Sequence, residues 1–275
     1  MSVVPRLLGL VPVSWRRAVI GPQDRPSGIA TFLHNFLNRQ HPTGPFACRG
    51  VLEGYRMHAN WAIYRSFIYG TWEPEIVRTV IQKVKPGMTV LDIGAHNGFY
   101  TLVFAKQVGL EGHIFSFEPM PANFETLQKN ILLNNLQSVV QVFPYAIFSR
   151  EEDLTLTVPD TNSGAGSVMS AGSGKQSRVH AVTLDSLGYR PDFIKMDIEG
   201  AEYDALLGAA KTIAQFRPVL LIELHHFDGN VAAHPVPEML AGWNYRIEWI
   251  ERAHLTSYIL AVPRDESSRP SAAKL

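Results

Sequence analysis

From residue 89 onward, short apolar segments alternate with segments in which apolar residues recur at helical spacing. Examples are the expected strands Thr89–Ile93 and Val219–His225 and the expected helix Phe99–Val108, which Gly109 closes. Short apolar strands separated by helices indicate a mainly parallel sheet with helices on both faces, an α/β fold. In such a sheet ligands bind at the carboxyl ends of the strands, so the residues that follow each strand are the candidates for function.

The same pattern predicts further elements along the chain. Strands are expected over residues 113–119, 139–148 and 192–197. Helices are expected over residues 75–84, 121–134 and 201–216. Two more strands, at residues 245–251 and 256–263, are expected to form an antiparallel pair that closes the fold.

A stretch rich in glycine and serine lies between two segments that alternate like strands, residues 154–158 and 177–184. We expect residues 160–177 to form a long loop that serves as a lid over a bound ligand. The chain is predicted to consist of an N-terminal annex with a helical segment, a domain built on the sheet, and a flexible tail, over residues 1–69, 70–264 and 265–275.

Composition narrows the choice of partners. Of the 275 residues, 25 are basic and 25 are acidic, so the formal net charge is zero. Nucleic-acid-binding domains need a surplus of lysine and arginine on one face, so no nucleic-acid partner is expected. No apolar run approaches the roughly 20 residues that span a bilayer. The lone Cys48 has no partner for an internal disulfide. These features favour a cytoplasmic protein without a transmembrane segment.

The first strand runs into the segment DIGAHNG, residues 92–98. Gly94 can form a tight turn that lets a ligand approach the backbone, and Gly98 lets the next helix begin close to the sheet. Asp92 adds a carboxylate that would repel a pyrophosphate but attract a cationic group. His96 stands where nucleotide loops often have a middle glycine. The segment therefore predicts a ligand with a positive end.

The second strand is followed by Glu118, twenty residues after Gly98. An acid at this position can accept hydrogen bonds from both hydroxyls of a ribose. The alternative is a surface acid that caps the next helix. Because Asp92 and Glu118 follow neighbouring strands, the pair predicts a ligand that contains a ribose.

Acidic residues and a histidine also follow the later strands. In the segment DIEGAE, Asp197 and Glu199 are candidates to face a substrate or a metal ion. Glu202 is expected to support the helix that begins there, because acids are stabilised near a helix N-terminus. In the segment IELHH, Glu223 lies two residues before His225, so both side chains point to the same side of the strand. Histidine is the most common general base near neutral pH.

Several segments together resemble the FkbM-type family of S-adenosylmethionine-dependent methyltransferases. In chain order they are GTWEPE, KPGMTVLDIGAHNGFYTLVFAK, GHIFSFEPMPANFETLQKN, VTLDSL, FIKMDIEGAEYDALLGA and RPVLLIELHH. They run from about Gly70 to His226. The resemblance implies a Rossmann-like class I methyltransferase fold, with a mostly parallel seven-stranded sheet and an antiparallel last strand. It also implies methyl transfer from S-adenosylmethionine to a hydroxyl of a sugar or a natural product.

The resemblance assigns Asp92, Gly94 and Gly98 to the loop that binds the methyl donor. The family loop commonly reads D-x-G-A-N-x-G, and His96 replaces the asparagine here. A histidine can still form a hydrogen bond, so His96 is also expected to contribute to donor binding.

The same resemblance implies roles for residues outside this loop. Glu118 would bind the ribose of the donor, and Tyr145 and Ala146, after the third strand, would border the adenine. Glu73, in the segment WEP, matches a position near the methionine end of the donor. The end of the third strand lacks the acid that many methyltransferases use for the adenine amine, so backbone groups are expected to take its place.

A sulfonium methyl is already activated, so the protein mainly has to align it with the acceptor oxygen and take up the acceptor proton. Either His225 or Asp197 is expected to act as this base, and either Glu223 or Glu199 is expected to orient or bind the small-molecule acceptor. Two carboxylates, Asp197 and Glu199, could also hold Mg²⁺, although this pattern is too common to define a metal site.

Two other functions fit a sheet of this kind. A nicotinamide-dependent oxidoreductase would require a G-x-G-x-x-G loop, without an acid two residues before its first glycine, and this chain has no such loop. The second alternative is a protein that binds the donor without catalysing a reaction. The acids at four strand ends argue against this alternative.

Overall fold

The computed structural model describes residues 43–159, 174–226, 234–252 and 255–264. The helical segment expected near the N-terminus, most of the predicted lid and the predicted tail lie outside the described residues. Among the helices that the structure describes, none is both long enough and apolar enough to cross a membrane.

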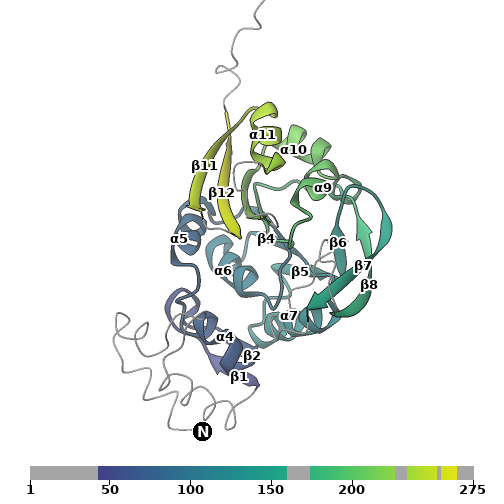
Figure 1. The fold of residues 1–275 in the computed structure, drawn as a ribbon. Coiled ribbons are helices and arrows are strands. Elements are labelled where there is room, and N and C mark those ends of the chain that lie inside the picture. Colours follow the sequence, from purple (N-terminus) through teal and green to yellow (C-terminus); the bar gives the residue numbers. More distant parts are fainter. Residues whose placement is uncertain (1–42, 160–173, 227–233, 253–254, 265–275) are drawn as a thin grey trace, which may run out of the picture.

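A seven-stranded sheet forms the centre of the fold (Figure 1). In spatial order its strands are β11 (Tyr245–Arg252), β12 (Thr256–Pro263), β10 (Val219–His225), β9 (Phe193–Met196), β3 (Thr89–Ile93), β4 (His113–Phe117) and β5 (Val140–Phe143). The strands from β10 to β5 pair in parallel, whereas β12 runs antiparallel to β10 and to β11. This Rossmann-like sheet confirms the predicted α/β fold and its antiparallel last strand.

Helices cover both faces of the large sheet, as its apolar strands require. One apolar cluster joins the sheet to α5 (Pro74–Lys83), α6 (Phe99–Val108) and α7 (Pro121–Leu133). A second cluster joins it to α9 (Glu202–Leu207), α10 (Ala210–Phe216) and α11 (Pro235–Gly242). Val90 and Leu91 are neighbours in β3 and belong to different clusters, so this strand is buried on both faces.

A second, smaller sheet has three strands, β6 (Tyr145–Ile147), β8 (Gly174–Val182) and β7 (Glu152–Pro159). The single strand expected over residues 139–148 is therefore wrong, because β5 and β6 belong to different sheets. Pro144 separates them, since proline has no backbone N–H to donate to a sheet. The predicted loop is also too long at its end, because residues 174–177 are part of β8.

The helix expected over residues 201–216 consists of two helices, α9 and α10, which are separated near Gly208. A Cβ atom on Gly208 would lie 1.9 Å from the carbonyl oxygen of Phe148, so only a glycine permits this close approach. The second helix has its own cap, because the Asp185 side chain, from α8 (Leu184–Leu187), accepts hydrogen bonds from the main-chain N–H groups of Lys211 and Thr212.

The part of the predicted annex that the structure describes contains two strands as well as helices. Its elements are β1 (Gly44–Ala47), the short 3₁₀ helix η1 (Gly50–Leu52), β2 (Arg56–Ala59) and α4 (Trp61–Ile68). Asn130 of α7 accepts a hydrogen bond of 2.6 Å from the main-chain N–H of His58 in β2. Met57 and Trp61 are buried in the same cluster as α5 and α6. The boundary near residue 70 stays a prediction, but this segment packs directly on the domain that follows.

Candidate active site

The loop between β3 and α6 lies directly against the end of β9. Gly94 has a φ of +82°, and a Cβ atom there would lie 1.8 Å from the carbonyl oxygen of Asp197. Gly98 has a φ of +92°, and a Cβ atom there would lie 2.7 Å from Cδ1 of Leu127. Both positions need a glycine, because other residues would suffer strain and a steric clash. The Gly94 contact brings this loop and the end of β9 together at one edge of the sheet, and the Gly98 contact brings the loop close to α7.

Glu118 connects the end of β4 with the same loop. Its carboxylate accepts hydrogen bonds from the main-chain N–H of His96, at 2.7 Å, and of Met120, at 2.9 Å. Burial raises the pKa of Glu118 to about 7, although these N–H groups stabilise the charged form. The structure thus brings together two of the predicted donor-binding residues, His96 and Glu118.

His96 also contacts a residue that the sequence patterns did not single out as part of this loop. The hydroxyl of Tyr64, from α4, lies 3.4 Å from Nε2 of His96, and the two rings meet edge to face at 5.5 Å between centroids. The annex therefore reaches the donor loop. The aromatic residues around position 64 were a signal for this contact, but they fitted core packing equally well.

Asp92 lies at the end of β3, beneath α6. Its side chain is fully buried, and Oδ2 accepts a hydrogen bond of 2.6 Å from the hydroxyl of Thr101 in α6. Burial raises the pKa of Asp92, while the nearby Lys195 ammonium opposes this shift. The hydrogen bond to Thr101 lets Asp92 support the loop, and its contact with the donor stays a prediction.

The ends of β9 and β10 place Asp197, Glu223 and His225 together. One side-chain ligand atom from each of the three lies within 4.8 Å of those of the other two. Lys195, which is fully buried in β9, donates a hydrogen bond of 3.1 Å to Oδ2 of Asp197. Lys195 was missed from the sequence, although a lysine in an otherwise apolar strand is a visible signal, because a buried lysine needs a partner.

His225 lies between two carboxyl groups. Its Nδ1 is 2.8 Å from Oε1 of Glu202, and its Nε2 is 3.4 Å from Oε2 of Glu199. Burial lowers the pKa of His225, but the carboxylates of Glu202, Asp197 and Glu199 outweigh it and raise the pKa to about 10. Glu202, which was expected only to support a helix, is thus fully buried against this imidazole.

The pKa values of Asp197 and Glu223 are shifted in opposite directions. Burial raises the pKa of Glu223 to about 9, and the negative charge of Asp197 acts in the same direction. For Asp197, Lys195 and His225 outweigh burial and lower its pKa. At neutral pH Asp197 therefore carries the negative charge, Glu223 is protonated, and His225 is an imidazolium.

Glu73 joins this group through two tyrosines. The hydroxyl of Tyr100 donates a hydrogen bond of 2.6 Å to Glu73, and the hydroxyl of Tyr258 lies 3.1 Å from Glu73 and 2.5 Å from Glu223. A tyrosine hydroxyl has one proton and cannot donate to both carboxylates at once. A protonated Glu223 resolves this conflict, since it can donate instead of accept.

Unusual backbone geometry is concentrated among the predicted site residues. Of the six non-glycine residues with positive φ in the described chain, three are Glu73, His96 and Glu199. Such conformations carry strain and tend to occur at functional sites. The strain supports the choice of these three residues.

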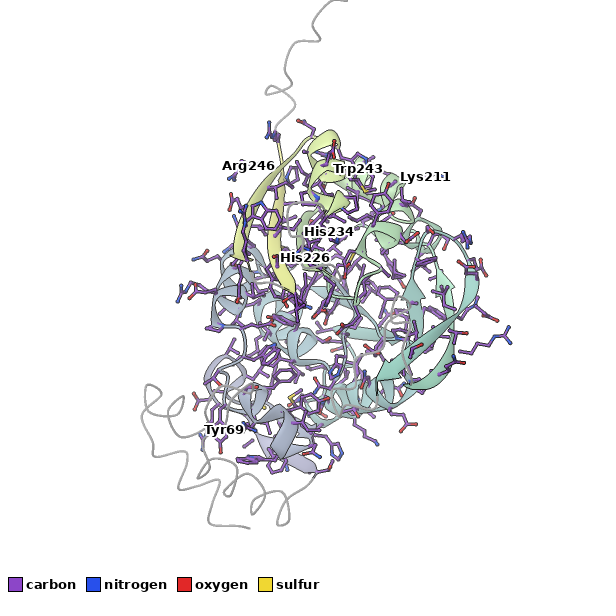
Figure 2. The ribbon with its side chains drawn as sticks, viewed as in Figure 1. Tyr69, Lys211, His226, His234, Trp243 and Arg246 are labelled. Atoms are coloured by element: carbon purple, nitrogen blue, oxygen red, sulfur yellow. The ribbon has the colours of Figure 1, made fainter. Side chains whose placement is uncertain are left out.

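Two of the predicted residues and one neighbour lie further from this group. Tyr145 and Ala146 begin β6, and the Tyr145 ring is stacked on Phe143, 6.2 Å away. His226 follows His225 but has separate partners, because it is buried against His234 with 5.5 Å between ring centroids (Figure 2). Its Nε2 lies 3.1 Å from the hydroxyl of Ser257.

The sheet order, the glycine loop and the buried acid after β4 define a Rossmann-like fold of the class I methyltransferase type. The chain belongs to the FkbM family of methyltransferases, because its residues 92–247, more than half of its length, match the methyltransferase FkbM domain.

Individual relatives are distant. The hexuronic acid methyltransferase AglP of Haloferax volcanii is 22% identical over 156 residues, which are 56% of this chain and 62% of that protein. The ribosomal RNA large subunit methyltransferase E of Acinetobacter baumannii is 29% identical over 83 residues, which are 30% of this chain and 33% of that protein. The chain thus spans less than two thirds of the length of these curated relatives.

Among solved structures, the methyltransferase FkbM from Methylobacillus flagellatus KT is similar to this chain with a TM-score of 0.48 and 21% sequence identity. The match covers 70% of this chain and 51% of that one.

Proposed function

We propose that this protein is an S-adenosylmethionine-dependent O-methyltransferase that acts on a hydroxyl of a sugar or a natural product. The observation that carries the proposal is the contact between the donor loop and the end of β9, where the space for a Cβ atom on Gly94 is filled by the carbonyl of Asp197. This contact puts Glu118 and the loop on one side of the sheet edge and Asp197, Glu223 and His225 on the other.

The donor would bind along the first of these groups. In this arrangement Glu118 accepts the ribose hydroxyls, and the backbone around Gly94, His96 and Gly98 faces the rest of the nucleoside. Glu73 provides negative charge near the positive methionine end. Tyr145 and Ala146, next to Phe143 at the end of β5, border the adenine.

Methyl transfer would occur at the second group. The methyl group passes from the sulfonium to the acceptor oxygen, and the acceptor proton passes to a carboxylate. Of the two residues predicted as the base, Asp197 suits this role better, because it is ionised at neutral pH whereas His225 already carries a proton. Alignment of the reactants contributes roughly 7–11 kcal/mol in such reactions, and a positioned base adds about 10²–10⁴-fold in rate.

The remaining residues of the group would hold the acceptor. The second carboxyl oxygen of Glu223 can accept a hydrogen bond from one acceptor hydroxyl, and Glu199, whose side chain is 39% exposed, can accept one from another. His225, paired with Glu202, keeps the charge of Asp197 in place.

Several observations bear on the acceptor and the location. AglP is named for a sugar acid, which supports a sugar-like acceptor for this chain. The similarity to a ribosomal RNA methyltransferase keeps a nucleic-acid acceptor open, whereas the balance of 25 basic and 25 acidic residues favours a small molecule. A cytoplasmic location is supported by the free, buried thiol of Cys48.

Calorimetry with S-adenosylmethionine tests the donor, and transfer of a labelled methyl group to extracts of the native host, followed by mass spectrometry, tests the acceptor. We expect saturable donor binding and a labelled hydroxyl product. A protein that is stabilised by NAD but does not bind S-adenosylmethionine would contradict the proposal.

A further inference from the structure

We propose that Asp197, Glu223 and His225 form a site for one divalent cation. Binding of the ion depends only on these three side chains. The inference rests on the proposed function only for what the ion would do in the reaction. Two carboxylates and one imidazole suit ions such as Mn²⁺, since carboxylates and imidazole are both among the ligands of first-row divalent metals.

The spacing of the three side chains fits a single ion. Their ligand atoms lie within 4.8 Å of one another. Two oxygen or nitrogen ligands that are each about 2.2 Å from one ion are separated by about 3.1 Å in neighbouring positions and about 4.4 Å in opposite positions. Small side-chain movements are therefore sufficient to bring the three groups onto one ion.

The partners of His225 resemble those of a metal-binding histidine. Its Nδ1 lies 2.8 Å from Oε1 of Glu202, and a carboxylate at this place orients the ring and leaves Nε2 for a metal. The distance of 3.4 Å from Nε2 to Glu199 is longer than a good hydrogen bond, so this pair does not hold Nε2 tightly. When an ion binds, Nε2 of His225 and the carboxyl group of Glu223 would each release a proton to solvent, and Nδ1 of His225 would keep its own.

A second observation comes from Glu202 itself. Its side chain is fully buried, and Oε2 accepts no hydrogen bond from any group that the structure describes. A buried carboxylate oxygen without a partner is costly. Glu202 is in contact with His225, so this oxygen lies in the carboxylate group that adjoins the cluster.

The charges of the cluster favour a cation. Carboxyl groups of Asp197, Glu199, Glu202 and Glu223 surround His225, and Lys195 is the ammonium that pairs with Asp197. Oδ2 of Asp197 accepts a hydrogen bond from Lys195. The side chain of Asp197 is 27% exposed, so the site can be reached from solvent.

Three protein ligands leave further positions open on an ion of coordination number six. An oxygen of the acceptor can occupy one of them. A hydroxyl bound in this way loses its proton more easily, which lowers the demand on Asp197 as a base. The ligand set differs from the pair of Asp197 and Glu199 that the sequence suggested for Mg²⁺, because Glu223 and His225 take the place of Glu199.

Titration of the chelator-treated full chain with Mn²⁺, followed by the electron paramagnetic resonance signal of free Mn²⁺, tests the site without donor or acceptor. We expect one bound Mn²⁺ per chain. Glu223→Gln and His225→Ala should abolish binding, and Glu202→Gln should weaken it about 10–100-fold, as the loss of an orienting carboxylate does. Glu151→Gln, an exposed acid just before β7, is the matched control and should bind normally.

Failure of this inference is separate from failure of the proposed function, because calorimetry with S-adenosylmethionine on the same samples decides the latter. A wild-type chain that binds S-adenosylmethionine but leaves all Mn²⁺ free would overturn the site. Equal Mn²⁺ affinity in the wild type and in folded Glu223→Gln would overturn it as well, and thermal unfolding of each variant establishes that it is folded.

Discussion

The main-chain N–H of His96 donates a hydrogen bond of 2.7 Å to Oε2 of Glu118. This bond joins the donor loop to the end of β4. It also holds the Glu118 carboxylate at the edge of the sheet where the loop lies. A second bond of 2.9 Å, from the N–H of Met120, holds the other carboxylate oxygen. Glu118 is thus oriented by the backbone before any ligand binds.

The first prediction follows from this orientation. Glu118→Ala should weaken binding of S-adenosylmethionine by roughly 100-fold or more, because hydrogen bonds to a charged group contribute about 1.5–3 kcal/mol each and two ribose hydroxyls lose their acceptor. Calorimetry measures this loss. Glu125→Gln, on the exposed side of α7, is the control. Normal donor affinity in a folded Glu118→Ala variant would remove Glu118 from the donor site.

The pH dependence of donor binding gives a second prediction. Burial raises the pKa of Glu118 to about 7, and ribose hydroxyls donate to the ionised form. Affinity for S-adenosylmethionine should therefore fall as the pH drops below about 7, by up to tenfold per pH unit. Glu118→Gln should bind weakly without this pH dependence. An unchanged affinity between about pH 8 and about pH 6 would contradict the role of Glu118.

The same group affects stability without donor. The folded chain holds the proton of Glu118 more tightly than the unfolded chain, whose pKa is near the ordinary value of 4.5. This contribution to stability is therefore full below about pH 4.5 and is lost as the pH rises through about 7. Bound donor, which favours the ionised form, should counter this loss in a thermal unfolding experiment near pH 8.

Gly94 supplies a third prediction, with a closely matched control. Gly94→Ala should reduce the free energy of unfolding by roughly 4 kcal/mol or more, because its Cβ atom would lie 1.8 Å from the carbonyl oxygen of Asp197. Gly87 has a similar φ, +81° against +82°, but no atom lies within 4 Å of a Cβ atom placed there. Gly87→Ala should cost only about 1–2 kcal/mol, the strain of the left-handed conformation.

Urea denaturation separates the two glycine variants. The difference between them isolates the steric contact between the donor loop and β9 from the strain that both share. If Gly94→Ala and Gly87→Ala are equally stable, the loop does not lie against β9 as described.

Much of the fold and part of the site could be predicted from the sequence. The apolar strands specified a parallel sheet, and a parallel sheet brings the residues after its strands to one edge, which is why Asp197, Glu223 and His225 meet as expected. The predicted boundaries of the third strand and of the helix over residues 201–216 were wrong, because Pro144 and Gly208 each determine the local backbone.

The roles of the charged residues were harder to predict. Spacing in the sequence does not tell which carboxylate an imidazole contacts, so Glu202 and the protonation of His225 could not be foreseen. The place of Asp92 in the loop predicted a ligand contact, but it did not reveal that the side chain also accepts a hydrogen bond from Thr101 of α6. Lys195 and Tyr258 lie within strands rather than after them. Their neighbours in the sequence are mostly apolar, so the pattern does not indicate that they belong to the site.

Asp197 provides a fourth prediction. Asp197→Asn keeps the size of the side chain but removes the charge that accepts the proton. We expect S-adenosylmethionine to bind and kcat for a hydroxyl acceptor to fall about 10²–10⁴-fold, which single-turnover kinetics would measure. Glu238→Gln, an exposed acid in α11, should have the activity of the wild type. Unchanged kcat in Asp197→Asn would exclude Asp197 as the base.

Lys195 carries the last prediction. Its ammonium is buried, lies 3.1 Å from Oδ2 of Asp197, and is 4.5 Å from the centre of the Tyr100 ring. Lys195→Met preserves the apolar stem but leaves the carboxylates of Asp197 and Asp92 without their cation. Breaking a buried ion pair by removing one partner costs about 3–5 kcal/mol, so the variant should unfold at lower urea concentration.

The control for Lys195 is Lys211→Met, because Lys211 lies on the surface at the beginning of α10 (Figure 2). Surface substitutions of this kind change stability by no more than about 0.5 kcal/mol. Part of the loss in Lys195→Met should be recovered at low pH, since protonation of Asp197 removes the unpaired charge. Equal stability of the two variants would mean that the ammonium is not needed to hold Asp197 and Asp92 inside the fold.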